Sequence, residues 1–484
     1  MPKKLKIVHI ASEVAPFSKT GGLGDVTRSL PKALKRLGHD VMIITPLYGK
    51  SIDKKKHHLK LISENVVVRL NSQEEVKVNY WQGYLMEGLP VYFIENKKFF
   101  SKHKKIYGSG RENARFLVFS VAALKLLSVL KLPVDIIHCH DWQTGLIPHY
   151  LKTDFRYSKT LKKAKTIFTI HNLIFQLGHN WWEIPLERRD YGRGKVPRLD
   201  DPRLEDINFA KRAILSADLI NTVSEQYREE IMTKKFGQDL QRILRNRADR
   251  LFGIINGIDH NTYNPEKDKD LYKRYSLNEI DIKFDNKKYL QKKIGLPVIN
   301  VPVVCTTSRV TFQKGFNLIL KVIDSLLKLN IQLIFLGDGN KEYIEPLKKL
   351  QRKNKNKLIW LPFDQKKESL LYAASDLFLL PSNHEPCGIN QLIAMRYGCI
   401  PVVRAIGGLH DTVTNFNPTT GKGTGFTFKT EDAHMFYAAV VRALENYKHE
   451  KVWRSLVMRA MKQSTSWEIP AKKYVELYKK AIND

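Results

Sequence analysis

Glycines and a lysine follow the first strand-like segment of the chain. The run KTGGLGDV, at residues 19–26, precedes a segment of helical character. Glycines let backbone amides approach a ligand closely, and the N-terminus of the following helix favours an anion. We therefore expect Lys19 to pair with a diphosphate, although a sharp strand-to-helix turn beside a solvated lysine would explain the same residues. The spacing fits neither the dinucleotide-binding G-x-G-x-x-G pattern nor a P-loop.

A second run with suitable chemistry, SNHEPCGINQL, also lies between a strand-like segment and an apolar helix. Free amides from Gly388 to Asn390 can bind phosphate there, and Glu385 can accept hydrogen bonds from sugar hydroxyls. The alternative interpretation is structural, because Glu385 can cap the helix and Pro386 can begin it.

Two cations five positions apart, Arg309 and Lys314, follow a further strand-like segment. Both can reach the same diphosphate, the guanidinium as a planar fork and the ammonium as a point charge. A pair of solvated basic side chains is the competing interpretation, because the whole chain is rich in lysine.

Histidines end two strand-like segments of the first half, in the runs HCHDW and TIHN. His138 and His140 share one face of a strand, which suggests a metal site. We predict no metal, because no third and fourth ligands are spaced to complete a zinc shell and no H-E-x-x-H is present. Asp141 and Trp142 offer a carboxylate beside an aromatic face, which suits a sugar ring, although a tryptophan in the core is the alternative.

The composition indicates a folded, two-domain protein with a basic surface. The chain has 484 residues, a length greater than one hydrophobic core usually organises. With 43% hydrophobic and 27% charged residues, it has the composition of a globular protein. Its formal charge of +32 raises the possibility of nucleic-acid binding. The lysine clusters are dispersed, without interleaved aromatic residues or a basic tail, so we predict no nucleic-acid partner and a field that favours an anionic substrate.

Cysteine usage and hydropathy bear on the compartment. Four cysteines are scattered without a C-x-x-C pair, which suits a reducing environment. The apolar stretch at residues 116–132 is interrupted by serines and lysines, so it predicts a buried helix and not a membrane span. The apolar run near the N-terminus is too brief for a signal peptide. We expect a cytoplasmic protein with no membrane partner.

Strand-like runs alternate with helical ones in both halves of the chain, which predicts parallel sheets with helices on both faces. We expect an α/β fold of two doubly wound, Rossmann-like domains with a cleft between them, at residues 1–255 and 256–460. An amphipathic helix within 461–484 should pack back on the first domain. The principal strand-like runs are 6–12, 41–45, 91–94, 136–140 and 166–171 in the first half, and 301–308, 331–337, 357–361 and 377–381 in the second.

Taken together and in this order, KTGGLGDV, HDWQTGL, HNL, NTVS, NGID, SRxxxQKG, EPCGINQL and GGLxDTV resemble the bacterial glycogen synthases and plant starch synthases. The resemblance extends over residues 6–478. It implies a GT-B fold and retaining transfer of glucose from a nucleotide sugar to an α-1,4-glucan, without a cofactor. Similarity to the bacterial group favours ADP-glucose over UDP-glucose. A related α-glycosyltransferase with another acceptor and a non-catalytic glucan-binding protein are the alternatives.

The resemblance also implies roles for individual residues. It implies that the two cations bind the donor phosphates, that the glutamate contacts the glucose hydroxyls and that an aromatic ring stacks on the nucleobase. The catalytic residues implied are His171, Glu385, Arg309 and Lys314; the donor-binding residues are Lys19, Gly21, Gly22, Asn172, Phe363, Gly388, Ile389 and Asn390; the acceptor-binding residues are Asp25, Asp141 and Trp142.

The chain departs from the family pattern at several positions. Asn383 and His384 precede Glu385, where family members usually have Arg and Phe. After HNL, the glycine is shifted to Gly178. Ile393 stands where related glycosyltransferases carry a second glutamate, and its absence favours a synthase.

Overall fold

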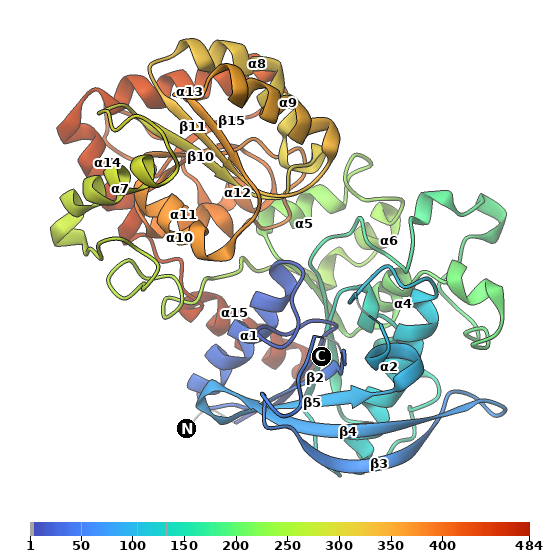
Figure 1. The fold of residues 1–484 in the computed structure, drawn as a ribbon. Helices are drawn as coiled ribbons and strands as arrows, with labels where there is room; N and C mark the ends of the chain where they lie inside the picture. Colours follow the sequence, from blue (N-terminus) through green and yellow to red (C-terminus); the bar gives the residue numbers. More distant parts are fainter. Residues whose placement is uncertain (1–3, 50, 104, 132) are drawn as a thin grey trace. The chain divides into compact units, whose positions relative to one another are not determined.

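The computed structural model describes residues 4–49, 51–103, 105–131 and 133–484 (Figure 1). Residues 1–3, Lys104 in one basic cluster and Leu132 at the end of the predicted apolar helix lie outside the described residues. The chain forms two compact units. Unit 1 comprises Met1–Asn256 and Trp467–Asp484, and unit 2 comprises Gly257–Ser466.

Unit 1 is built on a nine-stranded sheet of order β3-β4-β5-β2-β1-β6-β7-β8-β9. From β5 to β9 the neighbouring strands are parallel, as buried runs of Val and Ile between helical segments predict. The strands are β1 (Lys6–Ile10), β2 (Asp40–Pro46), β3 (Lys60–Arg69), β4 (Glu75–Leu85), β5 (Leu89–Glu95), β6 (Ile136–His140), β7 (Lys165–Ile170), β8 (Leu219–Thr222) and β9 (Leu251–Gly253).

At one edge the predicted parallel sheet continues into an antiparallel part that the sequence did not predict. There β3 pairs antiparallel with β4, and β4 pairs antiparallel with β5. These two strands were not predicted, because β3 is mostly exposed and its charged residues, one lysine, one glutamate and one arginine, blur the alternation that marks a half-buried strand.

The helices of unit 1 include the two that the sequence predicts, a buried apolar helix and an amphipathic terminal helix. The predicted apolar helix is α2, buried along almost its whole length. In the described part of the chain, no helix has the length and apolar character needed to cross a membrane. The helices are α1 (Gly22–Arg36), α2 (Glu112–Val129), α3 (Leu146–Lys152), α4 (Phe209–Ser216), α5 (Glu225–Ile231), α6 (Gln241–Arg245) and α15 (Glu468–Asn483).

The last helix, α15, belongs to unit 1 although it is far from it in sequence. Its apolar face carries Tyr474 and Tyr478, both fully buried. The Tyr478 hydroxyl lies 2.8 Å from Nδ1 of His138 on β6, and the Tyr474 hydroxyl lies 3.3 Å from Oδ1 of Asn221 on β8. Side chains of α15 therefore complete the core beneath the central strands.

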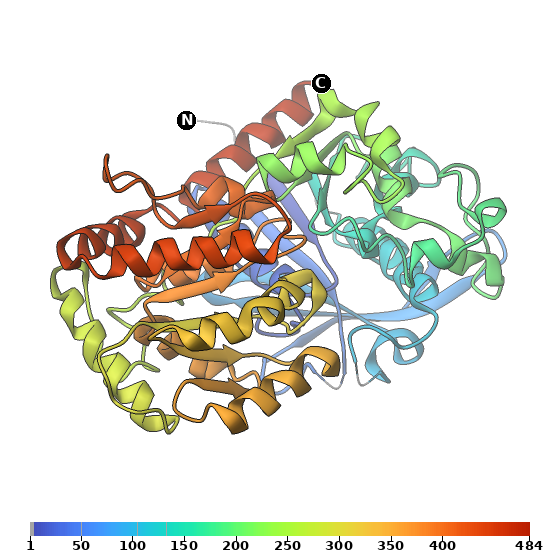
Figure 2. The same cartoon turned by 90° about the horizontal axis from the view of Figure 1, so that it is seen from above.

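Unit 2 has a six-stranded parallel sheet of order β12-β11-β10-β13-β14-β15, with helices on both faces (Figures 1 and 2). The strands are β10 (Val303–Thr307), β11 (Gln332–Leu336), β12 (Leu358–Leu361), β13 (Leu377–Leu380), β14 (Ile400–Arg404) and β15 (Phe426–Phe428). The helices are α7 (Lys283–Lys293), α8 (Phe316–Lys328), α9 (Lys341–Lys353), α10 (Gln365–Ala374), α11 (Asn390–Arg396), α12 (Gly407–Thr412), α13 (Ala433–Tyr447) and α14 (Glu450–Lys462).

Candidate active site

The glycine-rich loop of unit 1 follows β1 and leads directly into α1. Gly22 is the first residue of α1 and Gly21 its N-cap, and both are exposed. A Cβ atom added to Gly21 would meet no described atom within 4 Å. Open space therefore lies beside the N-cap of α1, and an anion there would be favoured by the N-terminus of the helix.

Lys19 and Asp25 form an ion pair at the start of α1. Nζ of Lys19 lies 2.8 Å from Oδ2 of Asp25, and each side chain is about one-third exposed. A pair this exposed is weak, because water screens both charges. The ammonium group can therefore exchange its carboxylate partner for a phosphate at little cost.

Glu13 anchors this loop, although we did not identify it from the sequence. Its buried carboxylate accepts hydrogen bonds from the Thr20 amide at 2.5 Å and the Thr20 hydroxyl at 2.7 Å. The Tyr107 hydroxyl donates to the same carboxylate at 2.6 Å. The only sequence signal was an acidic residue soon after a buried strand. Glu13 fixes the loop that carries Lys19.

Asp141 holds the segment that follows β7. Its Oδ1 atom accepts the backbone N–H of His171 at 2.7 Å, and its own φ is +57°. Such a backbone conformation is strained for a residue with a side chain and is typical of functional sites. Burial raises the pKa of Asp141 to about 7. The carboxyl group thus positions the HNL run from within unit 1.

The prediction that Trp142 offers its face to a sugar is wrong. The side chain is only 5% exposed and packs edge-on against Phe116 at a ring-centroid distance of 5.2 Å and against Phe209 at 6.1 Å. The indole belongs to the core between α2 and α4. Its size and apolar surface explain the burial, and the alternative interpretation of a core tryptophan is confirmed.

His171 and Asn172 lie at the carboxyl end of β7, and both residues are half-buried. Burial of the ring lowers the pKa of His171 to about 3. The imidazole is therefore neutral at physiological pH, so it can donate or accept a hydrogen bond without adding a positive charge. Oδ1 of Asn172 accepts the amide of Ile174 at 3.2 Å and shapes the turn that follows.

The argument against a metal from sequence spacing overlooked His9. Strand β1 pairs with β6, and its register sets His9 opposite His138, so a third imidazole joins His138 and His140. Five of the six ring nitrogens are nevertheless engaged in hydrogen bonds, and Nε2 of His9 has no partner among the described residues. Those of His138 contact Tyr478 and Thr169, and those of His140 contact His9 and His171, at 2.6–3.0 Å. These hydrogen bonds occupy nitrogens that a metal ion would need as ligands.

In unit 2, the loops after β10 and β13 meet because these strands are neighbours. Nζ of Lys314 lies 2.5 Å from Oε2 of Glu385, and the Ser382 hydroxyl donates to the same oxygen at 3.0 Å. Gly315, with φ +79°, allows this approach, since a Cβ there would lie 2.0 Å from the carbonyl oxygen of Pro381. Two of the residues implied by the resemblance are therefore in direct contact.

Gln313 ties the same two loops together. Its carbonyl accepts the amide of Asn383 at 2.9 Å, and its side-chain amide donates to the carbonyl of His384 at 3.2 Å. Its Oε1 accepts Nη2 of the exposed Arg309, also at 3.2 Å. This glutamine was not predicted as a site residue. It fixes the backbone on which both cations and Glu385 stand.

The structural alternatives for the glutamate run are wrong. Helix α11 begins at Asn390 with Ile389 as its N-cap, so Pro386 does not begin it and Glu385 does not cap it. Gly388 has φ +71°, which favours glycine at this turn. The Asn390 side chain donates to the carbonyl of Thr307 at the end of β10, at 2.5 Å.

The GGL run approaches the glutamate run from the end of β14. The amide of Gly408 donates to the carbonyl of Glu385 at 3.2 Å. A Cβ on Gly408 would lie 1.9 Å from the carbonyl oxygen of Cys387, so only glycine fits. Helix α12 therefore packs its backbone directly against the loop that holds Glu385.

Phe363 follows β12 at the same edge of the sheet as the other unit 2 loops. Its side chain is 51% exposed, and its amide donates to Oδ2 of Asp338 at 3.3 Å. An exposed aromatic ring on a short tethered loop is suited to stacking on a planar group.

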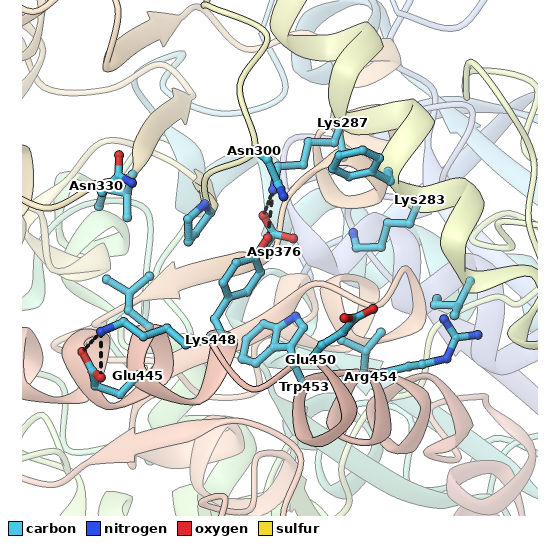
Figure 3. Close-up of a pocket in the computed structure, with 18 of the residues that line it drawn as sticks. Lys283, Lys287, Asn300, Asn330, Asp376, Glu445, Lys448, Glu450, Trp453 and Arg454 are labelled. Carbon is cyan, nitrogen blue, oxygen red and sulfur yellow. Dashed lines mark hydrogen bonds and ion pairs between the residues drawn. The ribbon is translucent and has the colours of Figure 1, made fainter.

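A cavity of about 840 Å³ lies at the opposite edge of the unit 2 sheet, beside Asn300, Asn330 and Asp376, before the strands begin (Figure 3). Its cations already have partners. Lys287 pairs with Asp376 at 2.7 Å, and Lys283 donates to three carbonyls at the end of α10. The size of this cavity does not make it the reaction site, because the loops with suitable chemistry follow the other ends of the strands.

Two doubly wound units, with cations, a carboxylate and glycine-rich loops beyond the ends of their strands, define the class: the chain is a GT-B glycosyltransferase. The fold is shared with sucrose-phosphate synthase from Thermosynechococcus elongatus, at 16% identity and a TM-score of 0.63 over 99% of this chain and 100% of that one. Residues 6–246 match the starch synthase catalytic domain, and residues 290–456 match the glycosyl transferases group 1.

Closer relatives define the family. The glycogen synthase of Thermosipho africanus is 39% identical over 99% of both chains. The catalytic domain of starch synthase IV from Arabidopsis thaliana, bound to ADP and acarbose, is 34% identical with a TM-score of 0.88 over 100% of both chains. The chain belongs to the family of bacterial glycogen synthases and plant starch synthases, and its activity is the glucosyl transfer of a glycogen synthase.

Proposed function

We propose that this chain uses ADP-glucose as its donor and extends the non-reducing end of an α-1,4-glucan with retention of configuration. The observation that carries the proposal is the contact between Lys314 and Glu385, a cation and a sugar-binding carboxylate held together at one strand edge. A related starch synthase whose structure contains ADP supports adenine as the base. The exposed ring of Phe363 is suited to stack on that base.

In the proposed mechanism, Arg309 and Lys314 neutralise the charge that grows on the leaving diphosphate. The bond between glucose C1 and the phosphate oxygen breaks, and the acceptor hydroxyl attacks C1 from the same face. The hydroxyl proton passes to the departing phosphate, so no enzymic nucleophile is required. Electrostatic stabilisation of this kind is often the largest single contribution to catalysis.

The remaining residues bind and orient. The exposed amides at Gly21 and Gly22 and the ammonium of Lys19 are suited to the diphosphate, and amides from Gly388 to Asn390 add further donors. Asn172 and the neutral ring of His171 would contact the reacting glucose. On the acceptor side we propose Asp25, with Asp141 contributing through the segment that it positions.

We also propose that the enzyme works in the cytoplasm. All four cysteines are buried, and none forms a disulfide in the described part of the chain, which suits a reducing compartment. Its positive charge would raise the local concentration of an anionic donor.

The test is to incubate the pure protein with glycogen and either ADP-glucose or UDP-glucose and to measure nucleotide release and glucose incorporation. We expect incorporation chiefly from ADP-glucose, and its loss in Glu385→Ala. Retention is checked by complete digestion of the new linkages with an enzyme specific for α-1,4 bonds. Incorporation from neither donor, or full activity in Glu385→Ala, would contradict the proposal.

A further inference from the structure

Three histidines of unit 1 form a continuous hydrogen-bonded row across neighbouring strands. Nδ1 of His9 on β1 lies 2.9 Å from Nε2 of His140 on β6, and Nδ1 of His140 lies 3.0 Å from Nε2 of His171, directly after β7. His9 and His140 are fully buried, whereas His171 is partly exposed. The row therefore runs from the core to the residue assigned to the reacting sugar.

All three imidazoles are neutral, which fixes how their protons are arranged. Burial lowers the pKa of both His9 and His171 to about 3 and that of His140 well below its ordinary value. A neutral imidazole carries one N–H and one lone pair. Two consecutive hydrogen bonds along the row then require every ring to donate in the same direction. The tautomer of His171 is therefore coupled to that of His9.

The buried end of the row decides the direction. Among the described residues, Nε2 of His9 has no hydrogen-bond partner. If the rings donate from His171 towards His9, this nitrogen is a buried, unpaired N–H. If they donate from His9 towards His171, it is only an unpaired lone pair. Orphaned N–H groups are the rarer of the two in folded proteins, so the second direction is favoured.

We propose that His9 and His140 are positioning residues that hold His171 as the Nδ1–H tautomer. Nε2 of His171 accepts the hydrogen bond from His140, and Nδ1–H is left as a donor, with no partner among the described residues. A fixed N–H would hydrogen-bond a hydroxyl oxygen of the reacting glucose without adding charge beside a developing glucosyl cation. This role rests on the proposed function, because it assigns His171 to the glucose.

The neighbouring His138 stands outside the row and provides a matched control. Its ring stacks on that of His140 at a centroid distance of 4.2 Å, yet its nitrogens contact the Tyr478 and Thr169 hydroxyls. Thr169 donates its own hydroxyl proton to Asn221 and so accepts from Nε2 of His138. Tyr478→Phe therefore perturbs the same core without touching the row.

The experiment compares wild type, His9→Leu, His9→Asn and Tyr478→Phe, each labelled with ¹⁵N-histidine. Long-range ¹H–¹⁵N correlation spectra report the tautomer of each ring, and the His171 signals are assigned by their loss in His171→Asn. We expect Nδ1–H for His171 in wild type and Tyr478→Phe, and a mixture of tautomers in His9→Leu. In His9→Asn, the side-chain amide lies near the former position of Nδ1 of His9 and can donate to His140 in its place. This variant should therefore restore the tautomer of His171.

Kinetics provide the second readout. His9→Leu should lower kcat about tenfold, the effect of one neutral hydrogen bond, with little change in KM for the donor, and His9→Asn should recover most of it. The proposal would be overturned if His171 carries Nε2–H in wild type, or if its tautomer is unchanged in His9→Leu. It would also be overturned if wild type binds a stoichiometric metal ion that His9→Leu does not bind. Absence of glucosyl transfer by wild type would instead contradict the proposed function, since the spectra do not depend on activity.

Discussion

Lys314 and Glu385, 71 residues apart in the chain, form an ion pair in which Nζ lies 2.5 Å from Oε2. Their side chains are 16% and 7% exposed, so each charge depends on the other for compensation. Removal of one partner of a buried pair is strongly destabilising, whereas replacement of both by apolar residues can be nearly neutral. The pair therefore contributes to both stability and catalysis, and single and double variants can separate the two contributions.

We predict that Glu385→Leu lowers the free energy of unfolding by about 3 kcal/mol, because Lys314 loses its partner. Adding Lys314→Met should restore most of this stability and none of the activity. Urea denaturation and nucleotide release measure the two effects. Recovery of activity in the double variant would show that neither charge takes part in transfer.

Lys19→Ala should leave stability almost unchanged and impair transfer. The exposed pair with Asp25 contributes at most about 1 kcal/mol to folding. The loss of a cation from the diphosphate should lower kcat/KM for the donor by about 10²-fold. Lys4→Ala, which removes a more exposed pair with Asp40, is the control and should behave as wild type. Equal donor kinetics in both variants would refute the role of Lys19.

Asp141 should make stability depend on pH. Burial raises its pKa from 3.8 to about 7. Between pH 3.8 and pH 7 the folded protein therefore keeps the carboxyl proton, whereas the unfolded protein has released it. Stability from this group is complete below pH 4 and is lost as the pH rises through 7. In Asp141→Asn, which retains an acceptor for the His171 amide, this loss should disappear. Urea unfolding of both proteins at pH 5 and pH 8 tests it, and parallel losses would contradict the assignment.

Trp142→Phe should reduce stability without altering glycogen binding. The indole fills a core site against Phe116 and Phe209, and full truncation of a buried tryptophan to alanine costs about 3–5 kcal/mol. The phenylalanine variant should lose less than that and keep the wild-type KM for glycogen. A several-fold rise in that KM with unchanged stability would restore the sugar-binding interpretation.

Sequence alone determined where the chemistry lies along the chain. Buried strands of Val and Ile, each followed by glycines or charged residues, predicted two α/β units and placed Lys19, Arg309 and Glu385 just beyond strand ends. Local patterns carry this information because strand and turn preferences act over a few residues. The ordered runs were also sufficient to identify the family.

Only the tertiary structure decided which side chains meet. The pairing of β10 with β13 brings Lys314 to Glu385, and the pairing of β1 with β6 brings His9 to His140. It also determined that the Trp142 ring is buried and that His171 is neutral. Strand order, register and burial depend on packing across the whole unit, so residues distant in sequence acquire partners that no local pattern specifies.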